Sequence, residues 1–142
     1  MILGDARLKM EEANAGQYQL IIVDAFSSDA IPIHLITREA IELYFSKMMP
    51  DGVLAVHISN RYLNLEPVLG NIAQELGYVA LREKDDNDDE VGKYTSDWVI
   101  LARKPADFGS LLQDKRWQPA ARKESVGVWT DDFSNLLSVF ER

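Results

Sequence analysis

The feature that most constrains the fold is a short apolar run, Leu20 to Val23, that ends abruptly at Asp24. Its β-branched residues and its lack of polar alternation are typical of a buried parallel strand. In open α/β sheets, ligand-binding side chains lie at the carboxyl ends of such strands. We therefore expect the Asp24 carboxylate to lie in a functional site at the end of this strand.

Apolar runs and helical patterns alternate along the rest of the chain. Strands are predicted at residues 20–23, 53–56, 78–81 and 98–102. Helices are predicted at residues 6–14 and 65–76, the second ending before Gly77. A further helix should begin after the N-cap Thr37 and end before the stop at residues 50–52. No helical pattern separates the last two strands, so they should form an antiparallel hairpin. The order predicts an α/β fold with a partial Rossmann-like sheet, mostly parallel, a C-terminal antiparallel hairpin and helices on both faces.

Composition limits the partners and the chemistry. The 142 residues suit a single domain over 1–142, and the net charge of -8 argues against a nucleic-acid partner. Cysteine is absent, which excludes disulfides and a thiolate nucleophile, and no metal site is expected. No apolar run approaches the roughly 20 residues of a membrane-spanning helix, so no membrane contact is expected from this chain. The acidic run 83–90 is interpreted as a solvated connection.

Four segments together resemble a known family: 4–6 (Gly-Asp-Ala), 23–29, 51–57 and 129–135. Their order and spacing are similar to those of spermidine synthase-like proteins, which are polyamine aminopropyltransferases with the class I S-adenosylmethionine methyltransferase fold. The resemblance covers nearly the whole chain and is closest to bacterial members whose soluble domain often follows a membrane segment. It implies a cytoplasmic domain, with a parent protein that can carry a membrane anchor.

The resemblance also implies roles for the residues that match. Asp24 would face the attacking amine of the acceptor and help to deprotonate it, because an ammonium group has no lone pair with which to attack. Asp5, beside the small Ala6, would accept a hydrogen bond from the adenine amino group of the nucleoside substrate. Asp5 could instead be the N-cap of the following helix, and the two roles can coexist.

The implied reaction transfers an aminopropyl group from decarboxylated S-adenosylmethionine to an amine such as putrescine, with methylthioadenosine as the product. Decarboxylated S-adenosylmethionine, or S-adenosylmethionine itself, is a co-substrate, and no prosthetic group is expected. Because a sulfonium is itself a good leaving group, positioning and electrostatics should supply most of the catalysis.

Three residues of the expected acceptor pocket depart from the family pattern or match it only in part. Asp29 would be the second carboxylate, but Ala25 and Phe26 are inserted before it, and it is equally well explained as a turn residue. His57 stands after the second buried strand, where polyamine-forming members carry Gln and then Glu; it could bind a substrate amine or make a structural bond. Tyr94 matches a tyrosine that lines the diamine pocket, but the Pro and two Gly that follow in the family are replaced.

Two elements that this fold uses to bind the nucleoside have no match: a glycine-rich turn after the first strand and an acidic residue after the second strand, which holds the ribose hydroxyls. The sequence contains no G-x-G-x-x-G turn, and only three residues precede Gly4. We therefore expect an N-terminally truncated domain that is inactive alone and has residues 20–23 as a sheet edge. Such an edge favours self-association, so the chain should dimerise through it, cover it with its own N-terminal segment, or behave poorly alone. The expected partners are an amine substrate and a second copy in a homodimer. A small-molecule methyltransferase and a non-catalytic nucleoside-binding or oligomerisation module remain the alternatives.

Overall fold

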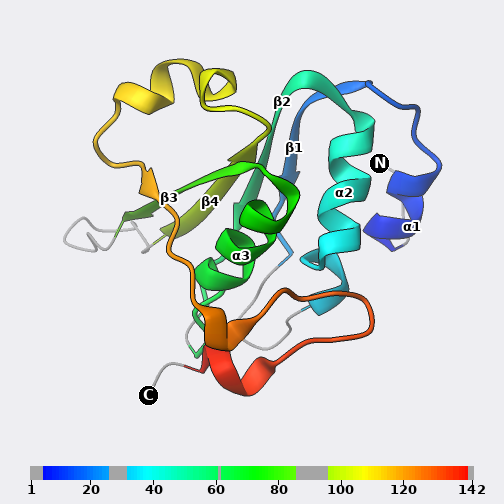
Figure 1. The fold of residues 1–142 in the computed structure, drawn as a ribbon. Helices are drawn as coiled ribbons and strands as arrows, with labels where there is room; N and C mark the ends of the chain where they lie inside the picture. Colours follow the sequence, from blue (N-terminus) through cyan, green and yellow to red (C-terminus); the bar gives the residue numbers. More distant parts are fainter. Residues whose placement is uncertain (1–4, 26–31, 61, 86–95, 141–142) are drawn as a thin grey trace, which may run out of the picture.

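The computed structural model describes residues 5–25, 32–60, 62–85 and 96–140. Its five strands form one sheet in the order β1-β2-β4-β3-β5 (Figure 1). Their bounds are Tyr18–Val23 for β1, Met48–His57 for β2, Val79–Asp85 for β3, Ser96–Ala102 for β4 and Gln118–Pro119 for β5.

The strand directions confirm the predicted mixture of parallel strands and a C-terminal hairpin. Strands β1, β2 and β3 run in the same direction, whereas β4 runs the opposite way between β2 and β3. Among the described strands, the β1–β2 ladder is therefore the one parallel pair, although most of the main strands are codirectional. Apolar periodicity identifies strands but not their neighbours, so the insertion of β4 could not be predicted from it.

Three α-helices accompany the sheet among the described residues: α1 (Ala6–Glu11), α2 (Arg38–Lys47) and α3 (Glu66–Leu76). Helices α2 and α3 share one core with the strand residues that face them, and α1 packs against α2 (Figure 1). The predicted caps of α2 and α3 are confirmed: Thr37 Oγ1 accepts a hydrogen bond from Ala40 N at 3.2 Å, and Gly77 ends α3 with φ 71°. None of these helices is long and apolar enough to cross a bilayer.

Strand β2 begins earlier than predicted, because it includes the Pro50-Asp51-Gly52 segment that was expected to end α2. Tyr18 pairs with Met48 and Leu20 with Val53, so the intervening residues of β2 form an irregularity in the ladder. A Cβ atom at Gly52 would lie 2.8 Å from Met48 Cβ and 3.2 Å from the Tyr18 carbonyl oxygen. The irregularity within β2, together with the nearby Tyr18 carbonyl group, therefore requires glycine at this position.

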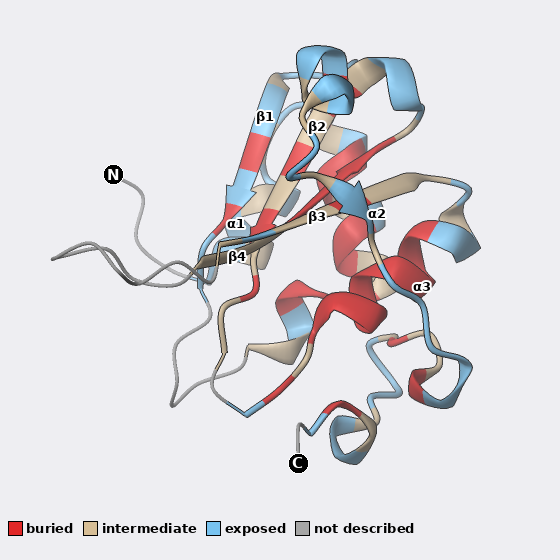
Figure 2. Ribbon diagram, turned by 90° about the vertical axis from the view of Figure 1, so that its left-hand side faces the viewer, coloured by how far each residue is buried: buried red, intermediate tan, exposed pale blue. Residues whose placement is uncertain are grey.

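The two faces of the sheet are covered unequally (Figure 2). On β1, the buried Ile21 and Val23 alternate with Leu20 and Ile22, which are 52% and 58% exposed. A 3-10 segment, η2 (Pro105–Gln113), covers the second face over β2 and β4 but leaves Leu20 and Ile22 in solvent. Helices thus lie on both faces, yet the β1 part of the second face and the outer edge of β1 are open among the described residues.

The C-terminal segment packs across α3 and α2 (Figure 1). The Asn71 side-chain amide donates hydrogen bonds to the carbonyl oxygens of Lys123 and Gly127, both at 2.8 Å. Trp129 is completely buried in the main core and anchors this segment. At Gly70, an added Cβ atom would overlap the backbone of Ala121, so α3 accepts the segment only because this position has no side chain.

We predict that Gly70→Ala destabilises the protein. Alanine normally stabilises a helix relative to glycine by about 0.5–1 kcal/mol, but here it would force the 121–122 backbone off α3, at a cost of about 1–3 kcal/mol. Chemical denaturation monitored by circular dichroism measures the change, with the exposed Glu75→Ala as the control in the same helix. A Gly70→Ala variant as stable as the unsubstituted protein would contradict this packing.

We also propose that the open edge of β1 mediates self-association, because unpaired strand backbone beside exposed Leu20 and Ile22 is a template for pairing with another strand. Sedimentation velocity should show a concentration-dependent dimer, and the double substitution Leu20→Lys and Ile22→Lys should shift it to monomer. Leu137→Lys, at a residue that is 84% exposed elsewhere, should leave the dimer intact. A monomer at all concentrations would rule out this surface as an interface.

Candidate functional site

The carboxyl ends of β1 and β2 bring an acid and an imidazole together. Asp24 follows the last residue of β1, and His57 is the last residue of β2. The two strands are parallel neighbours with Val23 paired to Val56, so both side chains emerge at the same end of the sheet. Asp24 Oδ1 lies 2.8 Å from His57 Nδ1. The Asp24 side chain is 62% exposed and that of His57 is 23% exposed, so the pair is accessible from solvent.

The antiparallel ladders extend this pair across the sheet. His57 pairs with Trp98 of β4, and Trp98 pairs with Glu83 of β3. The His57 and Trp98 rings stack, with centroids 4.7 Å apart and planes inclined by 23°. Directly paired residues point to the same face of a sheet. Four residues, three from β2, β4 and β3 and one directly after β1, therefore form what we call the strand-end row: Asp24, His57, Trp98 and Glu83.

The chemistry of the strand-end row suits a proton-bearing, cationic ligand. A carboxylate that holds one nitrogen of a neutral imidazole leaves the other nitrogen able to accept a proton. An indole face and a carboxylate both attract an ammonium group. The Glu83 side chain is 15% exposed, and its carboxylate lies 3.9 Å from the guanidinium of Arg116, which is the next charged group beyond the row. The arrangement can bind an amine and take a proton from it.

Two members of the strand-end row, Trp98 and Glu83, are absent from the site predicted from the sequence. The prediction placed Glu83 in a solvated connection, but residues 83–85 belong to β3; the remainder of that run lies outside the described residues. Trp98 lies beside His57, and Glu83 beside Trp98, only because β4 is inserted between β2 and β3. The available sequence signal was the alternation along β3, which puts Glu83 on the same face as Leu81.

Asp5 caps α1, as the structural alternative predicted. Its Oδ1 atom accepts hydrogen bonds from the backbone N–H groups of Arg7 at 2.9 Å and Leu8 at 3.2 Å, and its Oδ2 atom lies 3.2 Å from His34 Nε2. The hydrogen bond from Leu8, followed by the one from Arg7, lowers the pKa of Asp5. Ala6 begins α1 and is exposed, so a planar ring can approach the cap from solvent.

Arg7 ties α1 to α2 and to the C-terminal segment. Its guanidinium donates two hydrogen bonds to the Asp131 carboxylate, at 2.6 and 2.5 Å, and the Thr37 hydroxyl donates a third at 2.7 Å. The hydrogen bonds from Arg7 lower the pKa of Asp131. The Arg7–Asp131 pair thus attaches α1, with its Asp5 cap, to the C-terminal segment.

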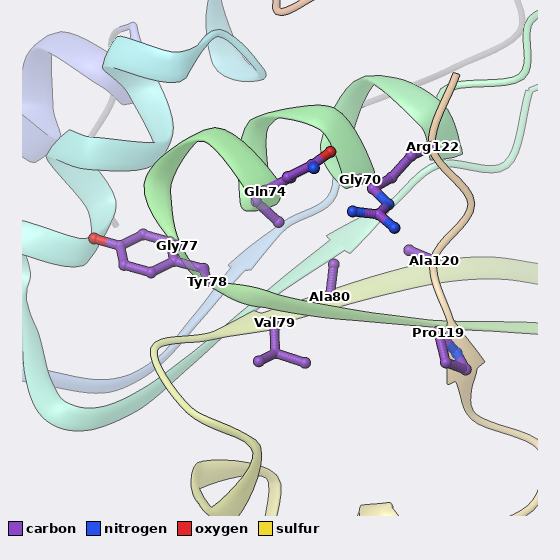
Figure 3. A pocket seen from close by; sticks show the side chains of 10 residues that line it. Gly70, Gln74, Gly77, Tyr78, Val79, Ala80, Pro119, Ala120 and Arg122 are labelled. Atoms are coloured by element: carbon purple, nitrogen blue, oxygen red, sulfur yellow. The ribbon is translucent and has the colours of Figure 1, made fainter. Parts of the chain in front are cut away.

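A separate depression lies between α3, β3 and β5 (Figure 3). It has a volume of about 410 Å³ and is lined by Gln74, Ala80, Pro119 and Arg122, among others. None of the residues of the predicted site lines it. Among the described residues, no group of three or more His, Cys, Asp or Glu side chains could hold a metal ion.

Asp29 and Tyr94 lie outside the described residues. Their roles as the second acceptor-side carboxylate and the pocket tyrosine therefore stay predictions.

We predict that the Arg7–Asp131 pair stabilises the fold in a pH-dependent manner. Because the folded-state pKa of Asp131 is lowered, its contribution is present above the unfolded value of about 3.9 and is lost as the pH falls through the folded-state pKa. Asp131→Asn should lower the melting temperature at pH 7, and this deficit should shrink towards pH 3. Asp132→Asn is the neighbouring control, and an equal Asp131→Asn deficit at both pH values would refute the linkage.

Neither a family model nor a curated protein sequence matches this chain. Among solved structures, it is similar to a probable spermidine synthase from Corynebacterium glutamicum ATCC 13032, with a TM-score of 0.61 and 17% identity over 95% of this chain and 55% of that chain. A second similar structure is MnmC2 from Aquifex aeolicus, with a TM-score of 0.48 and 17% identity over 87% of this chain and 38% of that chain. This chain thus spans about half the length of the probable synthase and a smaller share of MnmC2. The likeness to the probable synthase shows a Rossmann-like, methyltransferase-type fold.

Proposed function

We propose that this chain forms the acceptor side of an S-adenosylmethionine-type transferase that is similar to spermidine synthases and moves an aminopropyl group to an amine such as putrescine. The observation that carries the proposal is the Asp24 carboxylate at the end of β1, 2.8 Å from His57. The fold supports it, because the similar solved structure is described as a probable spermidine synthase. Since the chain covers 55% of that protein, the proposal assigns to it the acceptor site and the adenine contact only.

In the proposed reaction, the acceptor amine lies over the strand-end row. Its ammonium proton passes to the Asp24–His57 pair, and the freed lone pair attacks the carbon bound to the sulfonium. The carbon–sulfur bond breaks with its electrons going to sulfur, which leaves methylthioadenosine as a neutral thioether. Trp98 and Glu83 attract positive charge that remains on the acceptor. In the same proposal, Asp29 and Tyr94 complete the acceptor pocket.

Asp5 has the capacity to hold the adenine amino group. Its Oδ1 atom accepts two backbone hydrogen bonds, whereas Oδ2 faces one partner within the described part of the chain, His34 at 3.2 Å. A carboxylate oxygen offers two lone-pair sites, so Oδ2 can accept one further donor. The cap of α1 and an adenine contact are therefore compatible at this residue.

Methyl transfer to a small molecule is the second candidate function, and His57 favours it. An imidazole held by a carboxylate can deprotonate a hydroxyl or amine acceptor, and the resemblance places Gln, not His, at this position in polyamine-forming members. The two candidates differ in the group that is transferred, and both require a nucleoside at Asp5.

Nucleoside binding is the first test. Calorimetric titration of the protein containing this chain with methylthioadenosine should give a saturable heat of binding. Asp5→Ala should weaken binding roughly ten-fold, the equivalent of one hydrogen bond to a charged group, whereas the exposed Glu12→Ala should not. Absence of binding would leave the non-catalytic oligomerisation module as the surviving alternative.

The transfer itself is tested by mass spectrometry of the products. With decarboxylated S-adenosylmethionine and putrescine, we expect an aminopropylated product, and Asp24→Asn should lower kcat without changing nucleoside affinity. Asp51→Asn, at an exposed position before the buried part of β2, is the control. A methylated product from S-adenosylmethionine would select the second candidate, and equal losses of turnover and binding in Asp24→Asn would argue against its place at the acceptor.

A further inference from the structure

Only one ring nitrogen of His57 is engaged among the described residues. Nδ1 lies 2.8 Å from Asp24 Oδ1, and no described residue bonds to Nε2. The ring is held on one side by its stack with Trp98, and the side chain is 23% exposed. The unengaged nitrogen is therefore available to a ligand at the solvent side of the strand-end row.

We propose that His57 Nε2 accepts the proton of the acceptor amine and that Asp24 is a positioning residue that fixes the His57 tautomer. This inference rests on the proposed transfer function and assigns proton acceptance within it to His57 instead of Asp24. The resemblance to spermidine synthase-like proteins implied that the aspartate faces the amine directly, whereas here its oxygen is directed to a histidine.

The tautomer follows from the hydrogen bond. An ionised carboxylate can only accept hydrogen bonds, so the Asp24 contact requires a proton on His57 Nδ1. In the neutral ring, the lone pair is then on Nε2. Imidazole is also the side chain that gains and loses protons near neutral pH, which makes it a more effective general base there than a carboxylate.

The surroundings of His57 hold its backbone in place. Ile58 N donates to the Asp97 carbonyl oxygen at 2.8 Å, and Asp97 N donates to Ser59 Oγ at 2.9 Å. These bonds attach the chain that follows His57 to β4, the strand that carries Trp98. A base whose orientation is fixed by its neighbours is preorganised for proton transfer.

The Asp97 side chain is itself anchored. Arg82 donates to its two carboxylate oxygens at 2.8 and 2.5 Å and to the Glu66 carboxylate at 2.6 Å. Glu66 is buried and also accepts a hydrogen bond from Ala121 N at 2.7 Å. The support of the site therefore extends from β4 through β3 to α3.

Charge compensation makes proton uptake by His57 compatible with a cationic acceptor. Asp24 from β1 faces the ring directly, and Glu83 from β3 flanks Trp98 with Arg116 beyond it. When Nε2 takes the proton, the imidazolium and the Asp24 carboxylate form a pair with no net charge. The acceptor passes from ammonium to neutral amine, attacks the carbon on sulfur, and leaves as a secondary ammonium. His57 then returns its proton to solvent.

The tautomer is tested without any assay of transfer. The chain has two histidines, so His34→Gln assigns the His57 signals in a long-range ¹H–¹⁵N correlation spectrum. We expect Nδ1 to be protonated and Nε2 to be unprotonated at alkaline pH, and Asp24→Asn to abolish this preference. Asp51→Asn should leave the spectrum unchanged. A proton on Nε2 in the unsubstituted protein, or no effect of Asp24→Asn, would overturn the inference.

The base role is tested in the protein that shows transfer. His57→Ala should lower kcat by about 10²–10⁴, and added imidazole should restore part of it. Asp24→Asn should lower kcat less than His57→Ala does, and added imidazole should not restore it. His57→Gln, which keeps a polar planar side chain, is the variant that controls for loss of folding. If Asp24→Asn is the more damaging and imidazole rescues nothing, Asp24 is the base and the proposed function stands without this inference. If neither the unsubstituted protein nor any variant transfers the group, the proposed function is refuted, whichever tautomer His57 adopts.

Discussion

The parallel ladder between β1 and β2 is the constraint on which the rest of the site depends. Its register pairs Val23 with Val56, and the next residues, Asp24 and His57, meet at the end of the sheet. A slip of one residue would turn the apolar side chains of β1 to the opposite face, away from the core under α2 and α3. Burial of Ile21 and Val23 therefore fixes the register, and with it the contact between acid and imidazole.

Local physics explains why much of this fold could be predicted from the sequence. The apolar strands, the Thr37 cap and the Gly77 stop are encoded within a few residues of where they act, and the structure confirms each of them. The strand-end row could not be predicted, because it depends on which strands are neighbours. Asp24 was singled out by its position after an apolar run, whereas Glu83 joins the row through the β3–β4–β2 order. Asp29 and Tyr94 remain predictions because they lie outside the described residues.

A fold of this type supports many reactions, so the function rests on the side chains at its strand ends. The likeness to a probable spermidine synthase accounts for the scaffold alone. At the ends of β1 and β2, this chain brings Asp24 against His57, which stacks on Trp98. The histidine matters because it changes which atom can take a proton. The open face of β1 beside this site is apolar, and its exposed Leu20 and Ile22 are on the same side of the sheet as the strand-end row.

The most direct test of this account is a crystal structure of the protein containing this chain with methylthioadenosine and an acceptor amine bound. The account predicts an amine nitrogen within about 3.2 Å of His57 Nε2 and the adenine amino group at a similar distance from Asp5 Oδ2. It would be contradicted by an acceptor bound away from the strand-end row, for example in the depression between α3 and β5, or by an amine that contacts Asp24 while His57 faces away.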